Sequence, residues 1–479
     1  MNNQTKNILD DDRIGRLLLR MSLPVFFSMF VTVLYNIMDT IFIGRYVGSL
    51  GIAGLSIVFP IQMLSIGIGE MTGMGGASLV SRLIGAGNIP RAERAIGNAI
   101  TTTIVLSAIL MTAGLANPDF WLRLMGSSET ILPYARDYMT IILIGMFFMI
   151  FAMALNSLIR AEGNARIPMI GMIIGAVLNI ILDAIFIIPL GMGIKGAALA
   201  TVIAQLISAL YLMSYYFAGK SFLKIHSRNL IVEWNILKAI LAIGVASFAR
   251  LLAASLSAVF VNRMLVAYGG DYAVSAFGII NRIMMFAIMP GIVIGAGLQP
   301  ILGFNYGAKR YDSALKAIKL AIAAATACCV VVFIVLYFAP EPFIRLFTTD
   351  NELIALSSYA AKRIFLALYL IGFMMVGSLV FQSIGKATQS FVTAISRPFL
   401  FLIPLIFILP QFLQLDGVWL AFPIADALAF LLTLALLLPQ IRELRSMDLS
   451  AKRGGLLLRP EHCGEVKSGG VTSGIKSEE

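Results

Sequence analysis

Five ionisable residues stand inside long apolar stretches of the sequence and therefore need a partner or a function: Asp39, Glu70, Asp183, Arg250 and Asp426. A charge at the centre of a membrane helix costs about 3 kcal/mol on insertion scales unless it faces the interior of a bundle or water. Tyr35 and Asp39 are four residues apart, as are Asn179 and Asp183, so each pair shares one face of a helix. Two helices thus each present a carboxylate beside a neutral oxygen ligand.

The oxygen atoms of these side chains favour the binding of a hard cation. Thr201, in a later apolar stretch, adds a hydroxyl. Oxygen-only ligands suit Na⁺, and burial disfavours the charged form of a carboxylate, so a proton competes for the same groups. We therefore predict an ion-coupling site for H⁺ or Na⁺ that uses no cofactor, in which Na⁺ would be held by Asp39, Asn179, Asp183 and Thr201. The alternative is ordinary hydrogen bonding between helices, worth about 0.6 kcal/mol on average.

Helices must position these residues, because the chain is 59% hydrophobic and only 13% charged, with a mean hydropathy of +0.91. A stretch of about 20 apolar residues crosses a hydrocarbon core of about 30 Å, and a spanning helix satisfies its own backbone groups in lipid. The sequence predicts an all-α polytopic membrane protein with about twelve transmembrane helices. Their approximate spans are 17–43, 51–80, 93–116, 131–158, 167–189, 196–218, 236–265, 273–303, 315–338, 353–384, 389–410 and 417–440.

Lysine and arginine gather in alternate loops. The four groups are Arg82, Arg91 and Arg94; Arg160 and Arg166; Lys220, Lys224 and Arg228; and Lys309, Arg310, Lys316 and Lys319. The positive-inside rule places these loops and both termini in the cytoplasm. The same rule accounts for the net charge of +11, so no nucleic-acid partner is expected.

An internal repeat divides the chain into two similar halves. The segment that begins Gly85-Ala86-Gly87 resembles the one that begins Gly307-Ala308-Lys309, 222 residues later, and similar residues recur near this shift. An even number of helices per half lets both copies enter the membrane from the same side. We expect two pseudo-symmetric six-helix lobes: an N-lobe at 1–218, a cytoplasmic linker at 219–235, a C-lobe at 236–441 and a polar cytoplasmic tail at 442–479.

The predicted ion ligands do not recur in the second half. A shift of 222 residues takes Asp39 to Val261 and Asp183 to Leu405. Polar groups that the architecture itself requires should appear in both copies. The asymmetry therefore predicts that the ion chemistry is confined to the N-lobe.

The second helix of each half is interrupted at corresponding places, by Gly67, Gly69, Gly73, Gly75 and Gly76 and by Pro290, Gly291, Gly295 and Gly297. Such interruptions point to a transporter's central site, or else to tight packing through small residues. Glu70 stands among these glycines and either pairs with Arg250 or meets a cationic substrate. Pro24 is expected to kink the first helix, which makes it a candidate conformational switch.

Three segments resemble a known family. Residues 299–309 read Gln-Pro-Ile-Leu-Gly-Phe-Asn-Tyr-Gly-Ala-Lys, residues 39–44 read Asp-Thr-Ile-Phe-Ile-Gly, and residues 419–423 read Trp-Leu-Ala-Phe-Pro. Together they resemble the multidrug and toxic compound extrusion (MATE) family over residues 15–440. The resemblance implies a two-lobed antiporter that expels amphiphilic, often cationic compounds by alternating access, driven by entry of H⁺ or Na⁺.

The DinF-like prokaryotic branch of that family matches the N-lobe residue by residue. The resemblance implies a kinking proline at Pro24 and an ion site at Tyr35, Asp39, Asn179, Asp183 and Thr201. The NorM-like branch relies on acids in the seventh and tenth helices. None stands in the apolar parts of those spans here, which argues against a cation site in the C-lobe.

The expected protein is a multi-pass exporter of the prokaryotic inner membrane, a monomer that meets organic cations or drugs and the lipid bilayer, and no enzyme. One alternative is a lipid-linked saccharide flippase of the wider superfamily, which needs a strongly basic cavity, whereas only Arg250 and Arg282 are available. The other is a membrane-embedded transferase, which needs a metal or His/Glu site. The two histidines, His226 and His462, stand outside the predicted helices.

Overall fold

The computed structural model describes residues 9 and 11–457, and within them the chain forms helices and loops with no strand. The longer helices are α1 (Ile14–Tyr46), α2 (Ser49–Gly85), α3 (Ile89–Ala116), α5 (Leu132–Ala161), α6 (Arg166–Ile187), α7 (Gly193–Phe217), α8 (Trp234–Gly307), α9 (Tyr311–Phe338), α11 (Asn351–Ile364), α12 (Leu368–Ile384) and α15 (Pro410–Leu457). The shorter ones are α4 (Pro118–Leu124), η2 (Ser227–Leu230), α10 (Glu341–Ile344), η3 (Phe365–Ala367), α13 (Ala387–Ile395), η4 (Ser396–Leu402) and α14 (Ile403–Ile408).

The predicted all-α polytopic fold is confirmed. Within the described residues, 11 helical stretches are long and apolar enough to cross a membrane. One of them, α8, has 74 residues and a break at Gly270, where φ is 63°. Because a positive φ is open to glycine and interrupts a helix, α8 contains two of the predicted spans, and the count agrees with about twelve crossings.

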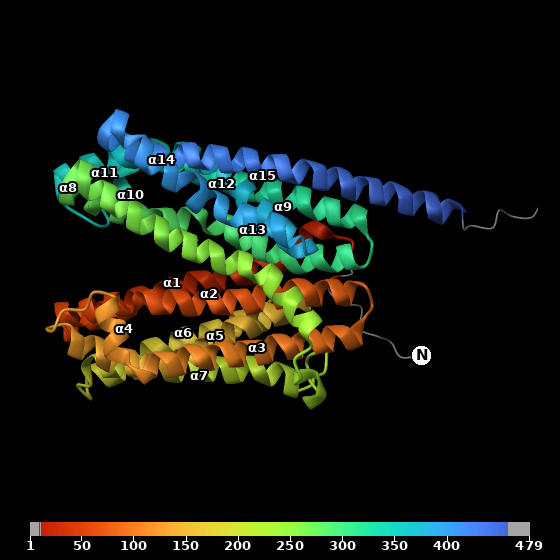
Figure 1. Ribbon diagram of the computed structural model, residues 1–479, viewed down its shortest axis with the longest axis horizontal. Coiled ribbons are helices and arrows are strands. Elements are labelled where there is room, and N and C mark those ends of the chain that lie inside the picture. Colours follow the sequence, from red (N-terminus) through yellow and green to blue (C-terminus); the bar gives the residue numbers. More distant parts are fainter. Residues whose placement is uncertain (1–8, 10, 458–479) are drawn as a thin grey trace, which may run out of the picture.

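Two bundles lie side by side along their length (Figure 1). Helices α1 to α7 belong to the first, and α9 to α15 belong to the second. Helix α8 begins beside the first bundle and crosses into the second (Figure 1). We call the first bundle the N-lobe and the second the C-lobe. Helix η2, between α7 and α8, lies within residues 219–235, the segment predicted as the linker.

Several predicted spans are subdivided. The span predicted at 389–410 contains α13, the π-helical turn η4 and α14. Pro398 and Pro404 lie in this span and have no N–H to donate, so the regular i to i−4 pattern is interrupted there. The last helix is longer than predicted, because α15 continues to Leu457, through part of the segment expected to be a tail. Residues 458–479, with His462 and Cys463, lie outside the described part of the chain.

The lobes meet through backbone-to-backbone packing of glycines at one end of the molecule. A methyl group at Gly244 would overlap the backbone of Met71, and one at Gly85 would overlap the backbone of Phe304. A methyl group at Gly307 would likewise overlap the carbonyl of Arg82. We call this end the basic end, since it carries Arg82, Arg91, Arg94, Lys309 and Arg310. These contacts close the basic end. Two of the glycines predicted to serve a site or tight packing also pack closely between the lobes, Gly75 against the Ile240 carbonyl and Gly297 against Ser22.

Candidate functional site

A central cavity of about 440 Å³ is lined by both lobes. The N-lobe contributes residues of α1, α2, α5, α6 and α7, and the C-lobe contributes residues of α8, α12 and α13. The lining has many methionines: Met29, Met74, Met146, Met149, Met153, Met172 and Met375. Unbranched Met side chains repack around ligands of different shape, so this wall suits a transporter with varied substrates.

The structure brings the predicted ion ligands to the N-lobe side of this cavity. Tyr35, Asp39, Asn179 and Thr201 line it. Asp183 lies behind the lining and is fully buried, one helical turn from Asn179 on α6. Asp39 is its charged neighbour. The spacings i, i+4 on α1 and α6 therefore produce one cluster rather than two separate sites.

The acceptor oxygens of this cluster lack donors. Both carboxylate oxygens of Asp183 and the Oδ1 atoms of Asp39 and Asn179 are buried, and no described residue donates a hydrogen bond to them. Asn179 donates from Nδ2 to Thr201 Oγ1, at 3.1 Å, while its amide oxygen is left without a donor. Buried polar atoms are normally satisfied. A set of unsatisfied oxygens from two acids and an amide fits a small cation, either Na⁺ or protons on the carboxylates.

Tyr138 and Gln62 adjoin the cluster and were not anticipated from the sequence. Gln62 Nε2 lies 3.3 Å from the hydroxyl of Tyr138, and both residues line the cavity. Tyr138 is close enough to Asp39 and Asp183 to interact with their charges. A tyrosine in the largely apolar α5 and a glutamine in α2 carry no distinguishing sequence signal, whereas an isolated Asp does.

Pro24 lies within α1, which is helical on both sides of it. Ser28 Oγ donates to the Pro24 carbonyl at 2.8 Å, and Ser28 lines the cavity. Proline removes one backbone hydrogen bond and adds a steric conflict with the preceding turn. The helix therefore has a weak point between the basic end and Asp39.

Glu70 and Arg250 form the ion pair that the sequence left open as one alternative. Arg250 Nη2 lies 2.7 Å from Glu70 Oε2, and both residues line the cavity. Glu70 is on α2 and Arg250 is on α8, so the pair joins the lobes. Asp426, the last of the five ionisable residues singled out in the sequence, is buried and pairs with Arg397 inside the C-lobe; neither residue lines the cavity.

Arg160 is a cavity residue, which corrects its assignment to a loop. Helix α5 extends to Ala161, three residues past the predicted end at 158, and the long side chain reaches back along the helix. Its Nη2 donates to Ser157 Oγ at 3.1 Å, and the cavity lining includes both residues. Arg82 is likewise in a helix, α2, where its Nε donates to the Ser78 carbonyl at 3.0 Å.

The family model described as MatE matches residues 24–185 and 246–408, one segment in each lobe. The chain belongs to the MATE family. It is accordingly a multidrug efflux transporter and not an enzyme, so the alternative of a membrane-embedded transferase falls away.

Relatives of known name agree with this MATE assignment. The multidrug export protein MepA of Staphylococcus haemolyticus (strain JCSC1435) is 28% identical over 427 residues, which cover 88% of this chain and 93% of MepA. The MATE multidrug transporter DinF-BH, solved as a complex with a ligand, is 40% identical, with a TM-score of 0.85 over 92% of this chain and 98% of that one. An outward-facing multidrug resistance MATE transporter is 27% identical, with a TM-score of 0.87 over 92% of this chain and 99% of its own.

Proposed function

We propose that this MATE transporter is an antiporter whose coupling ion, H⁺ or Na⁺, binds at Asp39, Asp183, Asn179 and Thr201. The observation that carries the proposal is the set of buried acceptor oxygens without donors in the N-lobe cluster. The two carboxylates need protons or a cation, because an uncompensated buried charge is unstable, and the Asn179 oxygen can serve as a neutral ligand of that cation. Tyr35 lines the cavity beside the same acids and completes the site.

The exported compound belongs to the class of amphiphilic organic cations in this proposal. Methionine side chains give an adaptable apolar wall, and Asp39 offers negative charge to a cation. MepA is named a multidrug export protein, and DinF-BH is named a multidrug transporter. These names support the use of the cavity for varied compounds here.

The coupling ion and the exported compound are exchanged because each stabilises a different state of the two lobes. Ion binding at Asp39 and Asp183 neutralises the charge that attracts a cationic substrate, so the substrate leaves when the ion arrives. The weak point of α1 at Pro24 lets the helix respond to that change. Coupling requires only that ion and substrate prefer different states, since a ligand with equal affinity for both shifts nothing.

The basic end faces the cytoplasm in this proposal, with both termini on that side and the transporter acting as a monomer in the cell membrane. Lys and Arg accumulate in cytoplasmic loops, and the glycine contacts that close this end leave the state described here sealed toward the cytoplasm. The cavity would then be accessible from outside, ready to release substrate and take up the ion.

The proposal is tested by efflux of ethidium, a fluorescent organic cation, from loaded cells or inverted vesicles under separately imposed proton and sodium gradients. Asp39→Asn and Asp183→Asn should each abolish gradient-driven efflux. Asp271→Asn is the matched control, because Asp271 is an exposed C-lobe acid that makes no ion pair with any described residue. Gradient-driven efflux at the wild-type rate in both variants would overturn the site. Efflux that responds to neither gradient would overturn antiport.

A further inference from the structure

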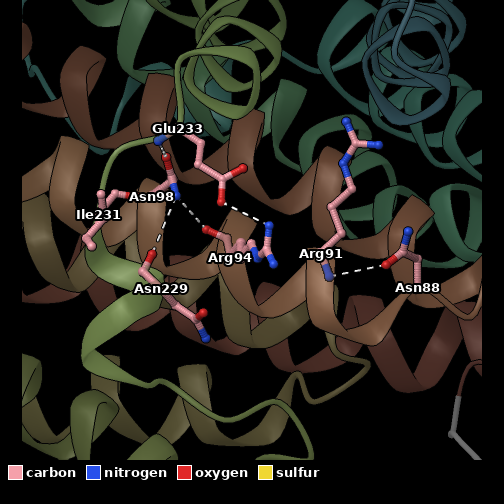
Figure 2. Close-up of polar contacts among 7 residues, drawn as sticks. All are labelled: Asn88, Arg91, Arg94, Asn98, Asn229, Ile231 and Glu233. Atoms are coloured by element: carbon pink, nitrogen blue, oxygen red, sulfur yellow. Dashed lines mark hydrogen bonds and ion pairs between the residues drawn. The ribbon is translucent and has the colours of Figure 1, made fainter.

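The segment between the lobes is fastened to α3 of the N-lobe (Figure 2). Asn98 Nδ2 donates to the carbonyls of Asn229 at 3.4 Å and Ile231 at 3.2 Å, and its Oδ1 accepts from the Glu233 backbone N–H at 2.6 Å. Gly97, the preceding residue, has no room for a side chain against Asn229. The segment therefore forms a fixed part of the surface at the basic end.

A hollow of about 360 Å³ opens beside this fastening. Its walls are the first turns of α3 and α8. Asn88, Pro90, Arg91 and Arg94 line it from the α3 side, and Glu233 and Asn235 line it from the α8 side. The hollow thus touches the N-lobe and the start of the helix that leads into the C-lobe.

The hollow has one more positive charge than negative, and one of its guanidinium groups is free of the other described residues. Arg94 Nη1 lies 3.2 Å from Glu233 Oε1, and both side chains are about half exposed. Arg91 is exposed, and among the described residues only its backbone N–H is engaged, by Asn88 Oδ1 at 3.2 Å. In Figure 2 its side chain extends away from α3, clear of the other residues drawn. A planar guanidinium with free donors is suited to bind phosphate oxygens in pairs.

A strip of apolar side chains lies next to the hollow and is an independent indication of its ligand. Leu230, Ile231, Val232 and Trp234 are 38%, 67%, 44% and 64% exposed. The Lys238 amino group lies 5.5 Å from the centre of the Trp234 ring. Tryptophan with neighbouring lysine is typical of the level of lipid headgroups. Apolar side chains exposed beside the free guanidinium of Arg91 match a molecule with acyl chains and an anionic head.

We propose that this hollow binds the phosphate of an anionic phospholipid, with Arg91 and Arg94 holding the headgroup and the acyl chains lying along Leu230, Ile231, Val232 and Trp234. Arg94 keeps donors for the phosphate while it contacts Glu233, and Glu233 limits the site to one anionic group. Because the lipid contacts α3 and the first turn of α8, it ties the N-lobe to the start of the helix that leads into the C-lobe. This site is separate from the cavity and does not depend on which ion or compound is exchanged.

The test uses Trp234 fluorescence in the full-length protein in nanodiscs. All proteins in this test carry Trp121→Phe. The chain has three tryptophans; Trp121 lies outside the linker region and is removed, and Trp419 is fully buried, so the exposed Trp234 reports on the lipid. Nanodiscs of phosphatidylcholine receive a minor amount of brominated phosphatidylglycerol or of brominated phosphatidylcholine. Each cation near an anionic lipid surface is worth about a fivefold preference. We expect quenching of Trp234 by the brominated anionic lipid to correspond to an enrichment of about fivefold or more.

Arg91→Gln and the double variant Arg91→Gln/Arg94→Gln should reduce this enrichment stepwise to about the value for bulk lipid. Lys319→Gln, which removes an exposed base on α9, is the matched control and should leave it unchanged. Equal quenching by the two brominated lipids overturns the proposal, and so does enrichment that persists in the double variant. Loss of enrichment on addition of inorganic phosphate at constant ionic strength would support recognition of the lipid through its phosphate, whereas binding of inorganic phosphate without any enrichment of the brominated anionic lipid would assign the site to free phosphate and overturn the lipid. The Arg91 side chain makes no contact that folding requires, so its single variant keeps the test valid if the double variant unfolds.

Discussion

Glu70 and Arg250 join the two lobes by an ion pair of 2.7 Å within the wall of the central cavity. Arg160 lies on the N-lobe near Glu70, close enough to interact with its charge. If the transporter alternates access as proposed, α8 moves away from α2 at this level and Arg250 leaves Glu70 in the opposite state. Glu70 then retains a cationic neighbour on its own lobe, because Arg160 moves with it.

Breaking the pair should favour the state that is open at the basic end. Glu70→Gln and Arg250→Gln each remove an attraction of about 1 kcal/mol, the upper range for a partly exposed pair, which corresponds to about a fivefold shift of population. The measurement is the distance between spin labels at Arg166→Cys and Lys319→Cys, after the three native cysteines have been replaced. The label positions lie on α6 and α9, one in each lobe.

A matched pair within one lobe controls for the loss of charge. Arg345 and Glu341 form an i, i+4 pair at 2.7 Å, and Glu341→Gln should leave the label distances unchanged. The idea fails if Glu70→Gln and Glu341→Gln give the same distance distribution.

Thr201 provides a prediction about the neutral part of the ion site. Thr201→Val keeps the shape of the side chain and removes the hydroxyl that positions Asn179, so the ion concentration for half-maximal efflux should rise about tenfold, the equivalent of one good hydrogen bond. Thr201→Ser retains the hydroxyl and should behave like the wild type. Equal ion dependence in the Val and Ser variants would remove Thr201 from the site.

The glycine contacts of α8 predict a substitution that disfavours the state closed at the basic end. A side chain at Gly244 would overlap the Met71 carbonyl, and overpacking of this kind costs about 2 kcal/mol. Gly244→Val should therefore disfavour the state closed at the basic end by roughly thirtyfold, seen as longer distances between the same spin labels. Gly278→Val is the control on the same helix, since a Cβ at Gly278 meets no atom within 4 Å. Unchanged distances in Gly244→Val would show that this packing does not set the state.

The membrane-spanning helices and the grouping of Asp39, Asn179 and Asp183 could be predicted from the sequence for the same physical reason. A bilayer forces long apolar spans, and against such a background Asp39 and Asp183 are visible as single letters. The i, i+4 spacings to Tyr35 and Asn179 then require only helix geometry. The internal repeat indicated which half holds these residues. A polar group that the architecture requires would recur in both halves, whereas the two acids occur in the first half alone.

Residues near helix ends, and contacts between segments far apart in the sequence, were less predictable. Arg160 was counted among loop bases, since a sequence does not specify whether an arginine at a helix end points to water or back into the bundle. The closeness of Asn229 to Gly97, and the pairing of Arg397 with Asp426, depend on tertiary packing between segments 131–133 or 29 residues apart. No local periodicity encodes such contacts.

Glu162 predicts a pH dependence of stability that is separate from transport. It follows directly after α5 and is buried, with Oε2 accepting from Ser221 Oγ at 2.6 Å and Tyr215 Oη at 3.1 Å. Burial raises the pKa of Glu162 to about 7, although these hydrogen bonds oppose the shift. The folded state thus binds the proton more tightly than the unfolded state does, so the stabilisation is present at low pH and is lost as pH rises through about 7. The loss should reach at most about 3 kcal/mol.

Thermal unfolding in detergent measures this effect of Glu162. From about pH 5 to about pH 8 the wild type should lose stability, whereas Glu162→Gln, which stays neutral, should show a flatter profile. Glu129→Gln, which changes an exposed acid, should keep the wild-type slope. If the stability of Glu162→Gln depends on pH as steeply as that of the wild type, another group causes the pH dependence, because the substitution removes only the titration of the buried carboxyl.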